Sequence, residues 1–185
     1  ALKPDYAEAH NNLGVTLQAL GRFTEAEVSY GQAIALKPNF TEAYSNLGNT
    51  LKELGRLDEA LASYSQAIEF KPDYAEAHNN LGNTLQALGR LTEALASYSH
   101  AIELKLDYAE AHYNLGNTLK ELGRLDEAEA SYSQAIRLKP GYTEALSNRS
   151  YLLFDKGKYE AALRDADACT LGKKNRALPL ISLYA

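Results

Sequence analysis

An asparagine recurs at a fixed interval along the chain, and its side-chain amide is suited to molecular recognition. The same register also places a second asparagine one helical turn further on in three of the five cases. An asparagine side chain offers one acceptor oxygen and two donor hydrogens, so it can pair with a peptide amide in both directions. Alternatively, such residues are simply solvated, or bond a neighbouring element of the fold. The two rows are Asn12, Asn46, Asn80, Asn114 and Asn148, and Asn49, Asn83 and Asn117.

The residues that could serve catalysis or metal binding form no recognisable site. His10, His78 and His112 share one repeated position that suits an aromatic packing residue, and His100 stands apart. A metal site needs clustered ligands, and neither a nucleophile motif nor a glycine-rich phosphate loop is found. Because repeats take up the chain length, we expect no enzyme activity, no cofactor and no metal.

Composition narrows the class of partner. The net charge is −5 and the basic residues are scattered, whereas nucleic-acid binding requires clustered Lys and Arg. No apolar run approaches the roughly 20 residues of a membrane span. The single cysteine, Cys169, excludes an internal disulfide and fits a reducing compartment. We therefore expect a cytoplasmic protein whose partners are neither nucleic acids nor membranes.

The 34-residue period organises the whole chain. Aromatic, glycine and alanine residues each recur in register, for example Phe40, Gly55 and Ala60. A period of this length indicates stacked helical hairpins. We divide the chain into residues 1–6 as the tail of a preceding repeat, repeats at 7–40, 41–74, 75–108, 109–142 and 143–176 (the last divergent), and 177–185 as the start of a C-terminal capping helix.

Each unit predicts two helices. The first should begin at an N-cap Asp or Asn, paired with a Glu three residues later, and end at a Leu-Gly pair whose glycine adopts the left-handed conformation. The second should begin at Thr or Asp and end at Lys-Pro; Leu106 replaces that proline, so we expect the helix before it to run on. The N-cap residues are Asp5, Asn39, Asp73 and Asp107, and the second helices open at Thr24, Asp58, Thr92 and Asp126.

Helical periodicity separates a packing face from a polar face on the first helix. Leu47, Gly48 and Leu51 fall on the packing side, whereas Asn46 and Asn49 point the opposite way. Tyr113, Tyr151 and Phe154 fall on the polar stripe. We expect them either to form an aromatic patch for apolar side chains or to pack at the end of the array.

These recurring residues resemble the tetratricopeptide repeat family. The second unit matches its pattern, and within the family the chain is most similar to the repeat superhelix of O-linked N-acetylglucosamine transferases and similar bacterial arrays. The fifth unit departs from the pattern, with Arg149-Ser150 in place of Leu-Gly. The matching residues of the second unit are Tyr44, Leu47, Gly48, Leu51, Ala60, Tyr64, Ala67 and Pro72.

The resemblance implies an all-α fold, a right-handed α-α superhelix of antiparallel helix hairpins. It also implies that the asparagine rows line a concave groove and hold the backbone of an extended peptide. We therefore expect a protein- or peptide-binding scaffold. One alternative is the substrate-recognition arm of a glycosyltransferase-like enzyme whose catalytic domain lies outside this chain. Another is a structural array that self-associates through its exposed ends.

Overall fold

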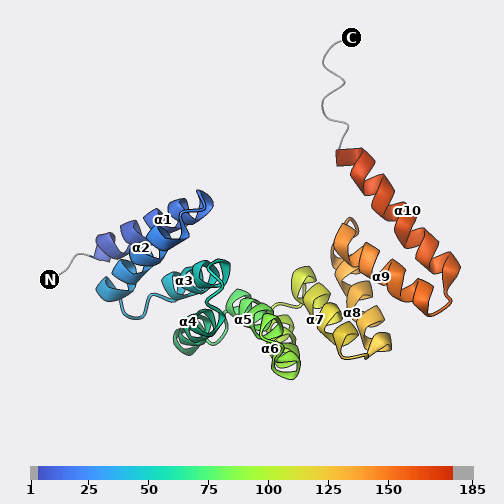
Figure 1. Ribbon diagram of the computed structural model, residues 1–185, viewed down its shortest axis with the longest axis horizontal. Helices are drawn as coiled ribbons and strands as arrows, with labels where there is room; N and C mark the ends of the chain where they lie inside the picture. Colours follow the sequence, from blue (N-terminus) through green and yellow to red (C-terminus); the bar gives the residue numbers. More distant parts are fainter. Residues whose placement is uncertain (1–3, 177–185) are drawn as a thin grey trace, which may run out of the picture. The chain divides into compact units, whose positions relative to one another are not determined.

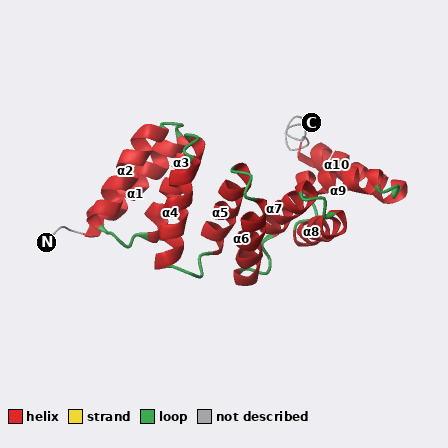
Figure 2. Cartoon of the chain, turned by 60° about the horizontal axis from the view of Figure 1, so that its bottom comes forward, coloured by secondary structure: helices red, strands yellow, loops and turns green. Residues whose placement is uncertain are grey.

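The computed structural model describes residues 4–176, and all regular structure in that range is α-helical (Figure 2). The predicted all-α class is therefore confirmed. The segment 177–185, which we predicted to start a capping helix, lies outside the described residues. The helices are α1 (Pro4–Ala19), α2 (Phe23–Leu36), α3 (Thr41–Glu53), α4 (Leu57–Phe70), α5 (Ala75–Ala87), α6 (Leu91–Leu104), α7 (Ala109–Glu121), α8 (Leu125–Leu138), α9 (Thr143–Asp155) and α10 (Tyr159–Arg176).

The helices form two compact units, Ala1–Lys105 and Leu106–Ala185. In the first unit, α1 pairs with α2, α3 with α4 and α5 with α6 (Figure 1). There α2 also packs on α3 and α4 on α5, while α1 contacts α3 and α3 contacts α5. In the second unit α7 pairs with α8 and α9 with α10, and α8 packs on α9. Within the first unit, the first helices of successive hairpins thus lie side by side.

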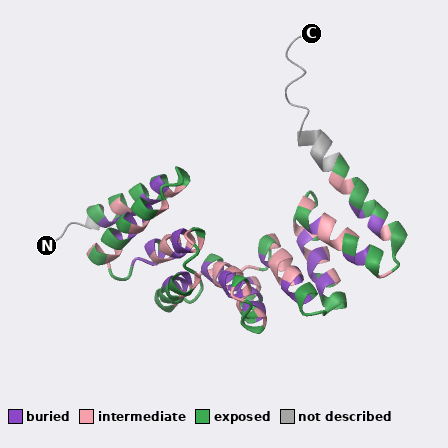
Figure 3. Cartoon of the chain, in the orientation of Figure 1, coloured by how far each residue is buried: buried purple, intermediate pink, exposed green. Residues whose placement is uncertain are grey.

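The core of each hairpin is built on a tyrosine facing a glycine. Tyr64 is completely buried, and a Cβ placed on Gly48 would lie 2.7 Å from its ring. The ring therefore occupies space that only glycine leaves open. The buried residues lie along the contacts between paired helices (Figure 3). The same pairing recurs at Gly14 with Tyr30, Gly82 with Tyr98 and Gly116 with Tyr132.

The predicted glycine turn between the two helices of a hairpin is confirmed. Gly55 has φ +75°, and its N–H donates to the Lys52 carbonyl at 2.9 Å. The next N–H, that of Arg56, donates to the Leu51 carbonyl at 2.9 Å. These two bonds satisfy carbonyls that the helix end would otherwise leave without a partner. Gly21, Gly89, Gly123 and Gly157 also have positive φ.

Two glycines of the first unit should respond in opposite ways to alanine. Gly55→Ala should destabilise the protein by about 1–2 kcal/mol, because a Cβ opposes the left-handed conformation. Gly31 lies inside α2, and a Cβ there would meet no atom within 4 Å. Gly31→Ala should therefore stabilise by about 0.5–1 kcal/mol through helix propensity. Urea unfolding followed by circular dichroism measures both, and equal effects would contradict the assignment of the turn.

The predicted N-caps of the first helices are wrong. The cap residues of α3, α5 and α7 are Phe40, Tyr74 and Tyr108, and none has a side-chain capping hydrogen bond. The caps thus fall one residue after Asn39, Asp73 and Asp107, while α1 already includes Asp5. Phe40 is only 7% exposed and packs in the core. Burial of the aromatic ring therefore determines the residue at which the helix begins.

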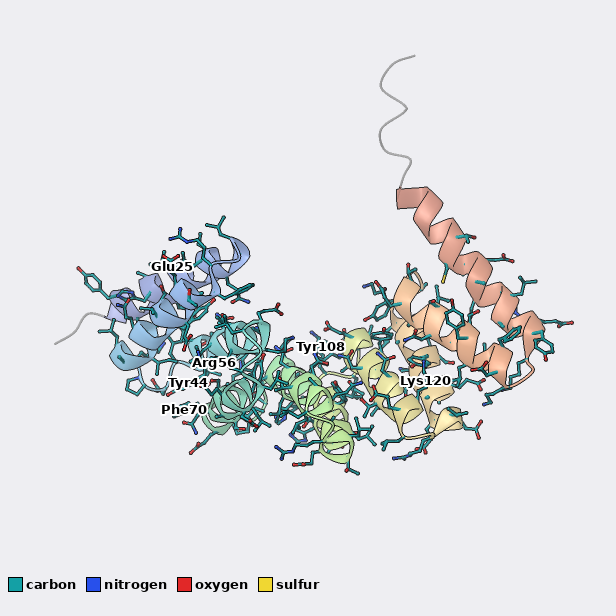
Figure 4. The ribbon with its side chains drawn as sticks, in the orientation of Figure 1. Glu25, Tyr44, Arg56, Phe70, Tyr108 and Lys120 are labelled. Atoms are coloured by element: carbon teal, nitrogen blue, oxygen red, sulfur yellow. The ribbon has the colours of Figure 1, made fainter. Side chains whose placement is uncertain are left out.

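The second helices also begin one residue earlier than predicted, at Phe23, Leu57, Leu91 and Leu125. Arginine is their cap residue, and it binds a glutamate of the first turn instead of capping a backbone N–H. Arg56, labelled in Figure 4, donates to both oxygens of Glu59 at 2.6 and 2.5 Å, and also to Glu27 of the preceding hairpin at 2.8 Å. The Arg56 guanidinium thus links the start of α4 to α2.

The expectation that α6 runs past its usual end is wrong. It ends at Leu104 with Lys105 as C-cap, just as α4 ends at Phe70 with Lys71 as C-cap. The last buried residue of α6 is Ala101. A further turn would gain no burial there, so the helix ends without needing a proline.

Candidate functional site

The first asparagine row lies on the first helices of the hairpins. Asn46 on α3, Asn80 on α5, Asn114 on α7 and Asn148 on α9 are half-buried, and Asn12 on α1 is exposed. Glu42 on α3 is exposed, whereas Gly48 and Leu51 of the same helix are buried. The separation of a packing face from a partly exposed asparagine face is thus found in α3.

Asparagine amides also connect successive hairpins within each unit. The Asn46 Nδ2 donates to the Asn11 Oδ1 at 3.1 Å, which joins α3 to α1. The Asn80 Nδ2 donates to the Asn49 Oδ1 at 3.2 Å, joining α5 to α3. In the second unit the Asn148 Nδ2 donates to the Asn117 Oδ1 at 2.9 Å. Bonding to the neighbouring hairpin was one of our alternatives for these residues. It accounts for one donor hydrogen of the Asn46 and Asn80 amides and, with a further bond to the Tyr113 hydroxyl, for both donor hydrogens of Asn148.

The second row is held by the core tyrosines. The Tyr64 hydroxyl donates to the Asn49 Oδ1 at 2.7 Å, and the Tyr132 hydroxyl donates to the Asn117 Oδ1 at 2.8 Å. Burial raises the pKa of Tyr132 to about 12, so this hydroxyl remains a proton donor at neutral pH. The Tyr98 hydroxyl donates in the same way to the Asn83 Oδ1, whereas the Tyr30 hydroxyl donates to the Gln18 Oε1. Tyr64 matched the family pattern in the sequence, but its hydrogen-bond partner was not identified there.

These bonds set the orientation of the amides. The Asn49 oxygen accepts from both Tyr64 and Asn80, so its Nδ2 hydrogens are directed elsewhere. Among the described residues, no hydrogen bond involves the Nδ2 of Asn49 or the Oδ1 of Asn46. One helix thus presents a fixed donor and an acceptor one turn apart. A peptide backbone offers the complementary pair.

The two tyrosines of the predicted aromatic patch have different surroundings. Tyr113 is half-buried, and its ring centroid lies 5.1 Å from that of Tyr142 and 6.1 Å from that of Tyr132. Its hydroxyl accepts from the Asn148 Nδ2 at 3.3 Å. Tyr151, in contrast, is 69% exposed. The ring contacts of Tyr113 are with Tyr132 and Tyr142 and do not include Tyr151.

The histidines have packing partners. The His78 Nε2 lies 3.0 Å from the Pro72 carbonyl oxygen, and its ring contacts that of His100 with centroids 4.4 Å apart. Burial lowers the pKa of His78 and of His112, which favours neutral rings. At the same repeat position, Tyr44 packs on Phe70 with ring centroids 5.6 Å apart (Figure 4). Within residues 4–176, no three His, Cys, Asp or Glu side chains are grouped as metal ligands would be.

An ion pair in the last hairpin was missed from sequence. The Arg149 guanidinium donates to both carboxylate oxygens of Asp165 at 2.7 Å and to the Ser133 hydroxyl at 2.8 Å. Asp165 is only 6% exposed. The other hairpins have leucine and serine at these two positions, for example Leu115 and Ser131. The signal was therefore a paired departure from the repeat, in which both positions change together in the same hairpin.

Comparisons with known proteins agree with the repeat pattern. Family models described as "TPR repeat" and "Tetratricopeptide repeat" match the chain, while none of the curated proteins is similar enough in sequence to count as a relative. The described helices include none long and apolar enough to cross a membrane. The matches cover residues 48–89 and 82–123 for the first description, and 7–40, 109–142 and 29–62 for the second.

Several solved structures share the fold. MamA is 26% identical with a TM-score of 0.80, covering 89% of this chain and 96% of its own. TTC0263, a TPR protein from Thermus thermophilus, is 28% identical with a TM-score of 0.72, covering 88% and 89%. YrrB, described as a TPR protein with an unusual peptide-binding site, is 24% identical with a TM-score of 0.69, covering 91% of each chain. The fold class is thus the α-α superhelix of tetratricopeptide repeat proteins.

Proposed function

The chain belongs to the tetratricopeptide repeat family, and from this we propose that it is a non-catalytic scaffold that binds an extended segment of a partner protein. The asparagine rows of the first helices would bind that segment. The observation that carries the proposal is the fixed orientation of the amides. Because the Tyr64 hydroxyl and the Asn80 amide both occupy the Asn49 oxygen, the Asn49 Nδ2 is left to donate outward.

The spacing of the helices suits an extended chain. Packed helices lie about 8–10 Å apart, and an extended peptide advances about 3.3 Å per residue. About three peptide residues would therefore pass each hairpin, with a donor such as the Asn49 Nδ2 and an acceptor such as the Asn46 Oδ1 meeting the backbone once per hairpin. Recognition through the main chain gives affinity while leaving side-chain preference broad. At the level of fold, YrrB is an example of a peptide-binding protein of this architecture.

A random-peptide library screened against the wild-type chain tests the proposal. Peptides that bind should lose about 100-fold in affinity to the variant Asn12→Ala/Asn46→Ala/Asn80→Ala, whose three positions all lie in the first unit, because three hydrogen bonds of about 1 kcal/mol each are removed. The matched control is Gln32→Ala/Gln66→Ala/Gln134→Ala, which removes three amides from α2, α4 and α8 and should bind normally.

Two results would contradict the proposal. One is equal binding by the asparagine variant and the wild type, with helicity unchanged. The other is no peptide binding by any of the three proteins together with a molecular size that rises with concentration. That second result would favour a self-associating array.

A further inference from the structure

Glutamates border the asparagines on the first helices of the first unit. An exposed glutamate stands four residues before each asparagine of the first row, and residues four apart lie side by side on a helix. On α3 a second exposed glutamate follows four residues after Asn49. We call these four residues the acidic border. They are Glu8 before Asn12, Glu42 before Asn46, Glu76 before Asn80, and Glu53 after Asn49.

Two members of the acidic border, Glu42 and Glu53, take part in no hydrogen bond or ion pair within the described part of the chain. We predicted that a glutamate such as Glu42 would bind the backbone at the start of the helix, and α3 has no such bond. The Glu53 carboxylate acts on the asparagine surface itself. Burial and, less strongly, this carboxylate raise the pKa of the Tyr64 hydroxyl, which binds Asn49. Both carboxylates are therefore free to bind a cation from outside.

The cations of the first unit do not neutralise the acidic border. The charged residues of α1, α3 and α5 are Asp5, the four glutamates of the border and a single cation, the half-buried Lys52. Other arginines and lysines of the unit are bound elsewhere, to glutamates of the second helices or over aromatic rings. They are Arg22, Arg56 and Arg90, paired with Glu25, Glu59 and Glu93, and Lys37 and Lys71, over Phe40 and Tyr74. The helices that carry the asparagines therefore have a net negative charge.

A lysine of the chain shows how the acidic border binds a cation. The Lys105 Nζ donates to a carboxylate oxygen of Glu76 at 3.2 Å. The two side chains remain 42% and 48% exposed, so the ion pair forms without burying either charge. Glu42 occupies the same repeat position as Glu76 and lacks such a partner. A lysine or arginine of a bound segment can pair with it in the same way.

We propose that the segment bound by the asparagine surface of the first unit is basic, with lysine or arginine side chains that pair with Glu42 and Glu53. This inference rests on the proposed function and names the chemistry of the partner. Because about three peptide residues pass each hairpin, a basic residue at every third position would meet the acidic border once per hairpin. An exposed ion pair changes affinity by only about twofold to fivefold. The border therefore favours basic segments without requiring one particular sequence.

Selection from one random-peptide library at low salt by three full-length proteins tests this proposal. They are the wild type, Glu42→Gln/Glu53→Gln, and the control Glu69→Gln/Glu103→Gln, which changes the net charge equally through exposed residues of α4 and α6. Lysine and arginine should exceed aspartate and glutamate about fivefold in the peptides selected by the wild type and the control, and about twofold at most with Glu42→Gln/Glu53→Gln. Replacing one lysine of a selected peptide by glutamine should weaken binding to the wild type about twofold to fivefold, and less at high salt.

Selected peptides without an excess of basic residues would overturn this proposal and leave peptide binding by the asparagine rows intact. The same holds for an excess that persists with Glu42→Gln/Glu53→Gln, or that falls equally with the control, because net charge rather than the acidic border would then be the cause. If none of the three proteins selects any peptide, the proposed function itself fails, and the basic partner with it.

Discussion

Replacing Asp165 with serine should destabilise the protein by about 3 kcal/mol, because it leaves the Arg149 charge without its partner in a largely buried site. Asp165 is 6% exposed, and the Arg149 side chain is 21% exposed. Breaking a buried pair costs far more than the pair contributes, since the remaining charge has lost its hydration. Urea unfolding measures the loss, and hydrogen exchange should place it in α9 and α10.

The repeats supply the matched rescue. The double variant Arg149→Leu/Asp165→Ser restores the leucine and serine of the preceding hairpin, Leu115 and Ser131, and should recover most of the stability. As a further control, Glu25→Gln breaks the exposed Arg22–Glu25 pair of α2 and should have little effect. A double variant as unstable as Asp165→Ser alone would show that the unpaired arginine is not the cause.

Tyr64→Ala should destabilise the protein by about 3–5 kcal/mol, the usual cost of truncating a buried aromatic side chain. Tyr64 is completely buried between α3 and α4 and fills the space above Gly48. The variant also removes the hydroxyl that holds the Asn49 oxygen at 2.7 Å. Thermal or urea unfolding provides the measurement.

Tyr64→Phe separates the ring from the hydroxyl. It should cost about 1 kcal/mol, the net value of one hydrogen bond, and it should also loosen Asn49. If the peptide surface depends on oriented amides, this variant should bind selected peptides more weakly although it remains folded. A cost equal to that of Tyr64→Ala would mean that the ring contributes nothing, which would contradict the packing on Gly48.

The hairpins were predictable because period and residue type act locally. A glycine such as Gly55, which must adopt positive φ, marks the turn in the sequence itself. The helix starts were not predictable from capping preferences, which amount to about 1 kcal/mol. Burying an aromatic ring such as that of Phe40 stabilises the folded state by about 1.5–3 kcal/mol. The buried aromatic residue is therefore the N-cap residue.

The candidate site was predictable as a row of residue types but not as a network. Periodicity alone placed Asn46 and Asn49 on the side of α3 away from its packing face. Their partners depend on distances between helices of the same hairpin or of successive hairpins, which no sequence pattern encodes. The bond from Tyr64 to Asn49 and the bond from Asn80 to Asn49 are both of this kind. Tyr113 is a similar case, because its neighbours Tyr132 and Tyr142 come from later elements of the fold.

The most direct test of the asparagine surface is an NMR titration that follows the side-chain amide signals of the isotope-labelled chain. A peptide selected by the wild type is added, and the signals of Asn46, Asn49 and Asn80 are compared with that of Asn39, which lies exposed in the turn before α3. We predict that the three signals on α3 and α5 shift on binding while that of Asn39 does not. Binding that shifts only amide signals of the second helices, such as that of Gln66 on α4, would place the peptide elsewhere and contradict the proposed surface.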